Sequence, residues 1–277
     1  MKIITDSGCD FTEDMKAQNG IFVEKVPLSL QIEDKEFIDD ENLNIDTYID
    51  EMRNSSGSPK SAAPPPQLYM DKFGGDESVF AVTLSSKLSC SYQNAEIAKK
   101  AYLSEYGHKF IHVFDSLTAC IGQTILVMKI NEFIKKNLSE NDIVEKVNSF
   151  IDGMRTFVVL ERYDNLVKNG RIKPYIAKLA SLLSIRPICI GKDGEMALFD
   201  KVRSTKKAIL RLAEIIASEK LDFERRILGI SHVRCMERAI FLKDEILKRV
   251  PFKDVIITSA GGICATYADT GGMVVSY

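Results

Sequence analysis

The sequence has no tryptophan, only three histidines, and none of the short motifs that mark common enzyme sites. It lacks G-x-x-x-x-G-K-[ST] for nucleotide phosphates, G-x-G-x-x-G for dinucleotides, H-E-x-x-H for zinc and G-x-S-x-G for a nucleophilic serine. These absences count against the familiar nucleotide-dependent enzymes, metallopeptidases and serine hydrolases. We therefore predict no catalytic residues and no cofactor.

Closely spaced cysteines are also missing. The six cysteines are scattered and form no C-x-x-C pair; they are Cys9, Cys90, Cys120, Cys189, Cys235 and Cys264. This spacing indicates neither a zinc site nor a disulfide framework, so no metal ligands are predicted. We expect reduced, mostly buried thiols in a cytoplasmic protein.

The chain has no excess of positive charge and no long apolar run. It has 37 Lys plus Arg residues and 39 Asp plus Glu residues, which gives a net charge of −2. A nucleic-acid partner is not expected, because binding to a phosphate backbone needs basic charge gathered on one surface. No apolar stretch approaches the ~20 residues that cross a bilayer, and Lys2 stands where a secretory signal needs apolar residues. We expect no stable membrane insertion.

Apolar, β-branched runs alternate with amphipathic segments, which is the pattern of a layered α/β protein. Strands are predicted at 2–5, 79–84, 110–114, 157–160, 227–230, 255–257 and 273–276, with extended structure at 22–32 and a hairpin at 185–202. Helices are predicted at 45–52, 91–105, 117–136, 139–154, 174–184, 206–219 and 235–249, and a short one ends at Gly170.

Two features bear on domain organisation. Residues 54–66 are rich in serine and proline, and we interpret them as a long irregular loop inside the first domain. Ser139 followed by Asp142 resembles a capping box, and the helix that it opens has an apolar face ending at Met154. We place the boundary there, so the predicted domains are residues 1–154 and 155–277.

Three loops follow apolar strands, where α/β sheets usually bind their ligands. They are Thr5-Asp6-Ser7, Ser85–Ser91 and Asp115-Ser116. The middle loop carries four hydroxyls in seven residues beside a predicted helix start, so it could donate hydrogen bonds to a small anion. Helix capping by Ser89 or Ser91 explains the same serines, and both interpretations stay open.

Six segments, in order and over essentially the entire chain, resemble motifs of the DegV family. The family patterns are T-D-S, T-S-x-P-S, I-S-S-x-L-S-G-T-Y-Q, V-x-D-S, L-x-K-G-G-R-I and V-R-T-x-K-K-A. The matching segments are residues 5–7, 61–65, 84–93, 113–116, 166–172 and 202–208. The match at 84–93 is the most specific, and the shared order makes the resemblance persuasive.

The resemblance implies a fold and a function. The implied fold is two α/β domains, with a parallel sheet in the N-terminal domain and a mainly antiparallel sheet in the C-terminal one. The implied ligand is a long-chain fatty acid between the domains, whose carboxylate is held by Ser61 and Ser89 with Arg203 near the head group. Some relatives present this lipid to a separate ATP-dependent fatty-acid kinase, which makes such a kinase the candidate partner. The resemblance therefore implies a carrier rather than an enzyme.

Three departures from the family pattern fall within this site. Ser61 replaces a threonine and keeps the hydroxyl. Cys90 replaces a glycine, so a backbone that needed positive φ there would have to change shape. Tyr267 stands in place of the histidine of H-T-G-P-G; it can donate a hydrogen bond but cannot carry an imidazolium charge. Lipid binding thus survives the comparison better than participation in a kinase cycle.

Other interpretations remain open at the level of sequence. An acyl or phosphoryl transferase could use the Ser85–Ser91 loop, although the missing nucleotide and metal motifs count against it. An interaction module without a ligand would leave the hydroxyl cluster unexplained. Ile121, Ile125 and Met128 on the helix after Ser116 could line a lipid tunnel or belong to the core.

Overall fold

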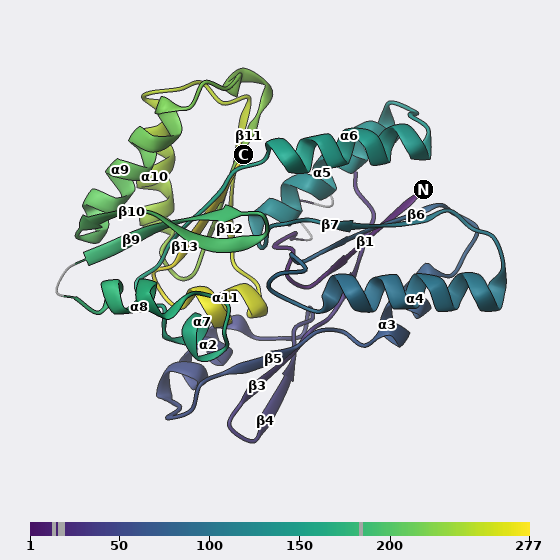
Figure 1. Cartoon of the computed structure of the whole chain (residues 1–277), viewed down its shortest axis with the longest axis horizontal. Coiled ribbons are helices and arrows are strands. Elements are labelled where there is room, and N and C mark those ends of the chain that lie inside the picture. The colour runs from purple at the N-terminus through teal and green to yellow at the C-terminus, as the bar shows by residue number, and fades with distance from the viewer. Residues whose placement is uncertain (13–14, 16–19, 183–184) are drawn as a thin grey trace.

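The computed structural model describes residues 1–12, 15, 20–182 and 185–277, which form three β-sheets covered by helices (Figure 1). Sheet A is four-stranded and parallel, in the order β2-β1-β6-β7. Its strands are β1 (Lys2–Asp6), β2 (Val23–Val26), β6 (Val79–Thr83) and β7 (Ile111–Asp115). The parallel sheet expected in the first half is confirmed.

Helices cover both faces of sheet A, because successive strand residues point to opposite sides. Ile4 and Ala81 belong to the core cluster under α3 (Pro66–Phe73) and α4 (Ser91–Tyr106). Their neighbours Ile3 and Phe80 belong to the cluster under α5 (Ile121–Lys135) and α6 (Glu140–Gly153). In Figure 1 these two helix pairs lie on opposite sides of the sheet.

Sheet C is six-stranded, in the order β10-β9-β8-β13-β11-β12, and only its β11–β12 pair is parallel. Its strands are β8 (Thr156–Val159), β9 (Ile185–Lys192), β10 (Glu195–Arg203), β11 (Ile227–His232), β12 (Asp254–Ser259) and β13 (Met273–Ser276). Phe157 and Val159 pack toward α9 (Thr205–Ser218) and α10 (Met236–Leu247), and a 3₁₀ turn (Phe223–Arg225) precedes β11. The mainly antiparallel sheet expected in the second half is confirmed.

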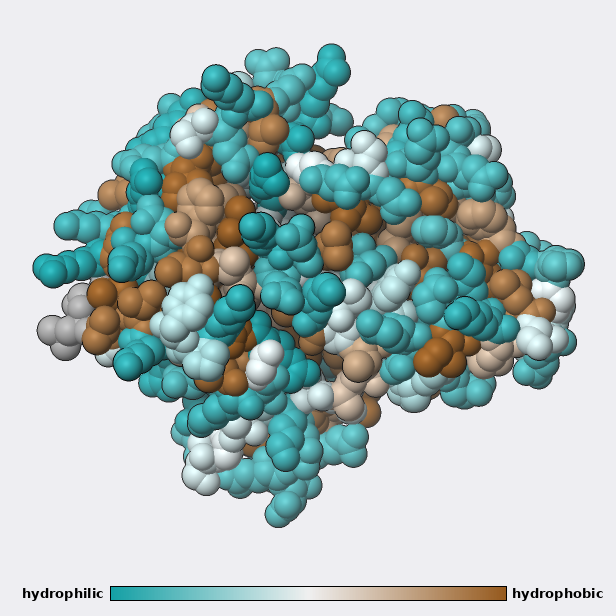
Figure 2. Space-filling model, in the orientation of Figure 1, coloured by the Kyte–Doolittle hydropathy of each residue, from teal (hydrophilic) through white to brown (hydrophobic). Residues whose placement is uncertain are grey.

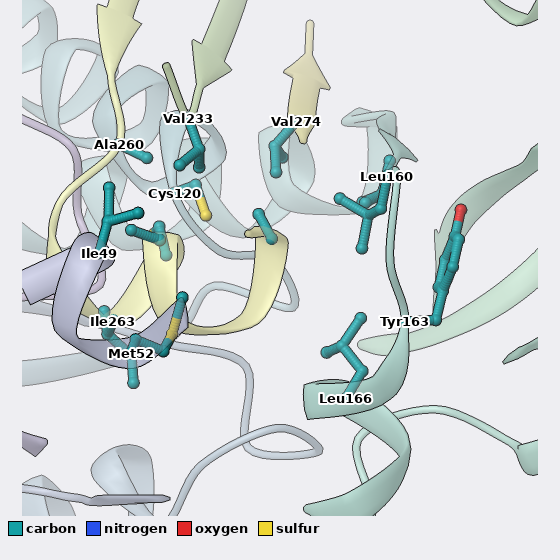
Figure 3. Packing of buried hydrophobic residues seen from close by; sticks show 14 of the residues in the cluster. Ile49, Met52, Cys120, Leu160, Tyr163, Leu166, Val233, Ala260, Ile263 and Val274 are labelled. Atoms are coloured by element: carbon teal, nitrogen blue, oxygen red, sulfur yellow. The ribbon is translucent and has the colours of Figure 1, made fainter. Parts of the chain in front are cut away.

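A small antiparallel sheet B, formed within the first half of the chain, packs against residues of the second half. It contains β3 (Ser29–Ile32), β4 (Lys35–Ile38) and β5 (Lys60–Ala62), and α2 (Ile45–Asn54) lies in the same segment. Three short helices of the second half are α7 (Asp164–Lys168), α8 (Pro174–Ala180) and α11 (Gly262–Ala268). Figure 3 shows Ile49 and Met52 of α2 beside Ile263 of α11 in one apolar cluster.

Helix α5 lies between sheets A and C. It contacts β1 and β6 on one side and β11 and β13 on the other. The fit is close: a Cβ on Gly229 of β11 would come within 2.4 Å of Ile121 Cγ1, and one on Gly122 within 3.0 Å of Ser276 Oγ. The strands of sheet A end at residue 115 and those of sheet C begin at residue 156, so 1–154 and 155–277 remain our proposed domains.

Several predicted boundaries were wrong. The stretch 22–32 is not one extended segment, because β2 and β3 belong to different sheets. Residues 54–66 are not irregular throughout, because they contain β5. Pro66 begins α3. A proline is tolerated at the first helical position because the backbone N–H that it lacks has no partner within the helix there. The helix after Ser116 begins late, at Ile121. The predicted end of α8 falls at 183–184, outside the described residues.

Within the described part of the chain, no helix is both long and apolar enough to span a bilayer. Figure 2 shows hydrophilic residues over much of one face of the molecule, interrupted by separate apolar patches.

Candidate functional site

A cavity of about 330 Å³ lies between the loops at the carboxyl edge of sheet A and the inner face of sheet C. Thr156, Val158 and Leu160 line it, because residues two apart on β8 share one face. Opposite them are Leu84, Leu88–Cys90 and Leu117–Cys120, which follow β6 and β7. The cavity therefore lies where segments of both halves of the chain meet.

Most of the cavity wall is apolar. Its aliphatic side chains come from both halves of the chain and include Leu28, Leu84, Leu88, Leu117, Val158, Leu160, Leu166, Met196, Ile263 and Val274. Such a wall suits a ligand with a long hydrocarbon part, because apolar contact supplies most of the binding free energy.

Ser61, Ser89 and Tyr267 place hydroxyls on the cavity wall, and Thr118 and Thr156 place two more there, 2.8 Å apart. The oxygens of Ser61 and Tyr267 are 2.8 Å apart. Ser89 Oγ accepts from the Ser91 N–H at 3.2 Å and lies 2.9 Å from Ser91 Oγ. Ser61, Ser89 and Tyr267 all line the cavity, so Ser89 both supports the start of α4 and presents a hydroxyl to the cavity.

An arginine stands beside these hydroxyls, but it is Arg171 rather than Arg203. The Arg171 guanidinium lies 5.5 Å from the centroid of the Tyr267 ring, its Nε donates to the Leu88 carbonyl at 3.3 Å, and the side chain lines the cavity. Arg203 is exposed at the end of β10, seven residues beyond the cavity-lining Met196, a distance of roughly 23 Å in an extended strand. The structure thus brings Ser61, Ser89, Cys90 and Tyr267 together and leaves Arg203 outside this group.

Cys90 does not require an unusual loop. Its φ is −77°, a value open to any residue, and it occupies the N-cap position of α4. The cysteine therefore fits where the family pattern has glycine, and its side chain is exposed at the rim of the cavity.

Asp6, from the first of the three loops singled out in the sequence, braces the site. Its carboxylate accepts from the Leu84 N–H at 2.7 Å, from Gln123 Nε2 at 2.9 Å and from the Gly8 N–H at 3.1 Å. Burial raises the pKa of Asp6, and these donors act in the opposite direction. Asp6 thereby ties β1 to the loop after β6 and to α5, which is a structural role.

The segment Leu117–Cys120 was missed as a cavity wall. Leu117 and Cys120 have φ values of 52° and 55°. A non-glycine residue loses free energy in this backbone region, and residues with such a conformation are often found at ligand sites. The left-handed residues delay the start of α5 and turn the loop into the cavity. Ile121 and Ile125 instead pack against Gly229 between the sheets, and Met128 packs in the core of sheet A, so this stripe belongs to the core.

The hairpin of β9 and β10 closes one side of the cavity. Gly194 at its tip has a φ of 81°, and its carbonyl accepts from Ser85 Oγ at 2.7 Å. A Cβ on Gly194 would come within 2.5 Å of that hydroxyl, so the tip lies close against the serine loop of the first half.

Comparison with known proteins decides the family. The model of the family described as "Uncharacterised protein, DegV family" matches residues 1–277. A DegV domain-containing protein of Streptococcus gordonii is 35% identical over 277 residues, covering 100% of this chain and 98% of the relative. The chain belongs to the DegV family.

Solved structures of DegV proteins have the same fold. A DegV protein of Ruminococcus gnavus described with vaccenic acid is 36% identical, with a TM-score of 0.94 and coverage of 100% of this chain and 99% of that one. The Streptococcus pneumoniae Fatty Acid Kinase (Fak) B3 protein, loaded with linoleic acid, is 31% identical, with a TM-score of 0.90 and coverage of 100% and 98%. Both relatives are thus described with fatty acids.

Beside the apolar cavity of this DegV protein lies a smaller polar one of about 180 Å³. Tyr267 lines both cavities. The second carries three basic side chains, Arg53, Arg162 and Lys168, and two acidic ones, Asp164 and Asp269. Tyr267 therefore lies where the apolar cavity meets a hydrophilic one.

Proposed function

We propose that this DegV protein binds one long-chain fatty acid in the 330 Å³ cavity, between its proposed domains, and acts as an acyl carrier. The observation that carries the proposal is an apolar cavity whose wall carries the hydroxyls of Ser61, Ser89 and Tyr267 and the Arg171 guanidinium. The two fatty-acid-bound relatives with this fold support it.

Tail and head have different energetic roles. Each buried CH₂ contributes ~0.8 kcal/mol, so the hydrocarbon tail dominates the affinity. Hydrogen bonds from the hydroxyls contribute about 0.5–1.5 kcal/mol each, and more from a charged donor. The head-group residues therefore fix the orientation of the lipid more than the total binding free energy.

The hydrogen bonds of the Ser85–Ser91 loop favour a carrier function over an enzymatic one. Ser85 Oγ is buried and donates to the Gly194 carbonyl, and Ser91 is buried as the first residue of α4. Ser89 is the hydroxyl of this loop that reaches the cavity, and it supports the helix start. A transferase would need a base beside that hydroxyl, but the hydrogen bonds of Ser89 Oγ within the described residues go to Ser91 and not to a histidine or a carboxylate.

We further propose that a separate fatty-acid kinase acts on the bound carboxylate. The support is the fold shared with the Fatty Acid Kinase (Fak) B3 protein and the position of Tyr267, which lines both the apolar cavity and the smaller polar cavity. A phosphoryl donor could approach the carboxylate from that polar side.

Native mass spectrometry of the purified chain, followed by identification of the released lipid, tests fatty-acid binding. We expect about one fatty acid per chain, because a buried tail leaves slowly. Delipidated protein that shows no saturable uptake of a long-chain fatty acid would rule the proposal out.

A further inference from the structure

The fold brings together two thiols and a carboxylate that are distant in sequence. Asp10, Cys120 and Cys264 each offer one ligand atom, and these three atoms lie within 4.8 Å of one another. All three side chains are buried. They come from the segment after β1, the start of α5 and helix α11, so the absence of any C-x-x-C spacing concealed the cluster. Figure 3 shows Cys120 close to α11.

The geometry points to a binding site for a thiophilic divalent cation, of which Zn²⁺ is the typical case, held by Asp10, Cys120 and Cys264. Two thiolates and one carboxylate match the donor preference of Zn²⁺, which accepts sulfur and carboxylate oxygen in a tetrahedral arrangement. Ligands about 2.0–2.3 Å from such an ion lie roughly 3.3–3.8 Å apart, so the cluster needs only a small contraction.

The Asp10 carboxylate accepts hydrogen bonds from neighbouring groups, as carboxylates that bind metal ions usually do. Asp10 accepts from the Gly261 N–H at 2.8 Å and from the Ser231 hydroxyl. These two donors fix the orientation of the carboxylate and leave lone pairs for an ion. The Cys264 thiol donates to the Gly8 carbonyl at 3.3 Å and would give up that proton on binding.

The two cysteines also provide a route for the ion. Cys120 and Cys264 line the large cavity, whereas Asp10 lies behind them. The fourth coordination position would therefore face the cavity, where water can occupy it. On binding, one M²⁺ ion would combine with two thiols and one carboxylate. The product is a complex with two thiolates and one carboxylate and a net charge of −1, and two protons are released.

Titration of metal-free, full-length protein with Cd²⁺ tests the inference, because two cadmium–thiolate bonds give an ultraviolet charge-transfer band. We expect one equivalent to bind, Zn²⁺ to displace it, and Cys120→Ser or Cys264→Ser to weaken binding at least about a hundredfold. Ser231→Ala, which removes a donor to Asp10, should weaken it by about tenfold to a hundredfold.

Cysteines outside the cluster supply matched controls. Cys189→Ser alters a buried thiol and Cys235→Ser a partly buried one, and neither should change the band. Because cluster variants could fail to fold, the unmodified chain is also treated with an alkylating reagent, with and without Zn²⁺, and mapped by peptide mass spectrometry. Selective protection of Cys120 and Cys264 supports the site. Protection of neither, or a band unchanged in both cluster variants, overturns it.

Discussion

The hydroxyls of Ser61 and Tyr267 lie 2.8 Å apart, although 206 residues of chain separate them. Ser61 is on β5 of sheet B and Tyr267 on α11, so this contact joins the first and second halves of the chain at the cavity wall. Each hydroxyl can donate to the other or to a ligand, which makes the pair sensitive to the presence of a carboxylate.

Removing either hydroxyl should weaken fatty-acid binding. We expect Ser61→Ala and Tyr267→Phe each to reduce the binding free energy by about 0.5–1.5 kcal/mol, with a double variant that is less than additive because the groups touch. Displacement of a fluorescent fatty acid measures this. Tyr175→Phe, at an exposed tyrosine on α8, is the control. Wild-type affinity in the double variant would place the carboxylate elsewhere.

The two arginines give a matched comparison. Arg171→Ala and Arg203→Ala remove the same charge, but only Arg171 lines the cavity. We expect Arg171→Ala to weaken binding by about 1.5–3 kcal/mol and Arg203→Ala to leave it within experimental error. Isothermal titration calorimetry, with thermal unfolding as a check on folding, distinguishes them. The reverse order would support the role that the family resemblance implies for Arg203.

Asp39 should make stability depend on pH. Burial raises the pKa of this carboxyl from 3.8 to about 6, although the N–H groups of Gly262 and Ile263 each donate to it at 2.9 Å. Between pH 4 and pH 6 the folded chain therefore holds a proton that the unfolded chain has lost. The stabilisation is complete below pH 4 and is lost as the pH rises through about 6, by an amount on the order of 2–3 kcal/mol.

Urea unfolding of delipidated protein from pH 4 to pH 7 measures this contribution. Asp39→Asn cannot titrate, so the difference in unfolding free energy between variant and wild type should change across that range. A constant difference would show that Asp39 titrates alike in the folded and unfolded chains.

Tyr267 separates lipid binding from phosphoryl transfer. Tyr267→His should leave fatty-acid binding intact and should preserve or raise acyl-phosphate formation by a fatty-acid kinase, because imidazole can become protonated near neutral pH. The measurement is transfer from ATP to carrier-bound fatty acid. Robust transfer by wild type with loss in the histidine variant would identify tyrosine as the working residue.

Sequence predicted the layered architecture and singled out the serine loop for local reasons, whereas Ser61 and Tyr267 entered as candidates through the family resemblance. Strands such as β6 are continuous apolar runs, and the serine loop is a compact motif. Arg171 was missed as a cavity residue because its position depends on how α7 and α8 pack against the first half of the chain. The three-residue strand β5 and the left-handed Leu117 and Cys120 were missed because tertiary contacts, rather than local preference, hold them.

The close packing of α5 constrains how the cavity can change its size. Gly122 and Gly229 leave no room for even one methyl group between this helix and sheet C, so the sheet cannot slide across the helix without losing that fit. A hinge between two rigid halves would have to disrupt the same contact. The β9–β10 hairpin meets the first half of the chain at its tip, through the Ser85–Gly194 hydrogen bond and not through α5. Opening the cavity at that tip would therefore break one hydrogen bond and leave the packing of the central helix unchanged.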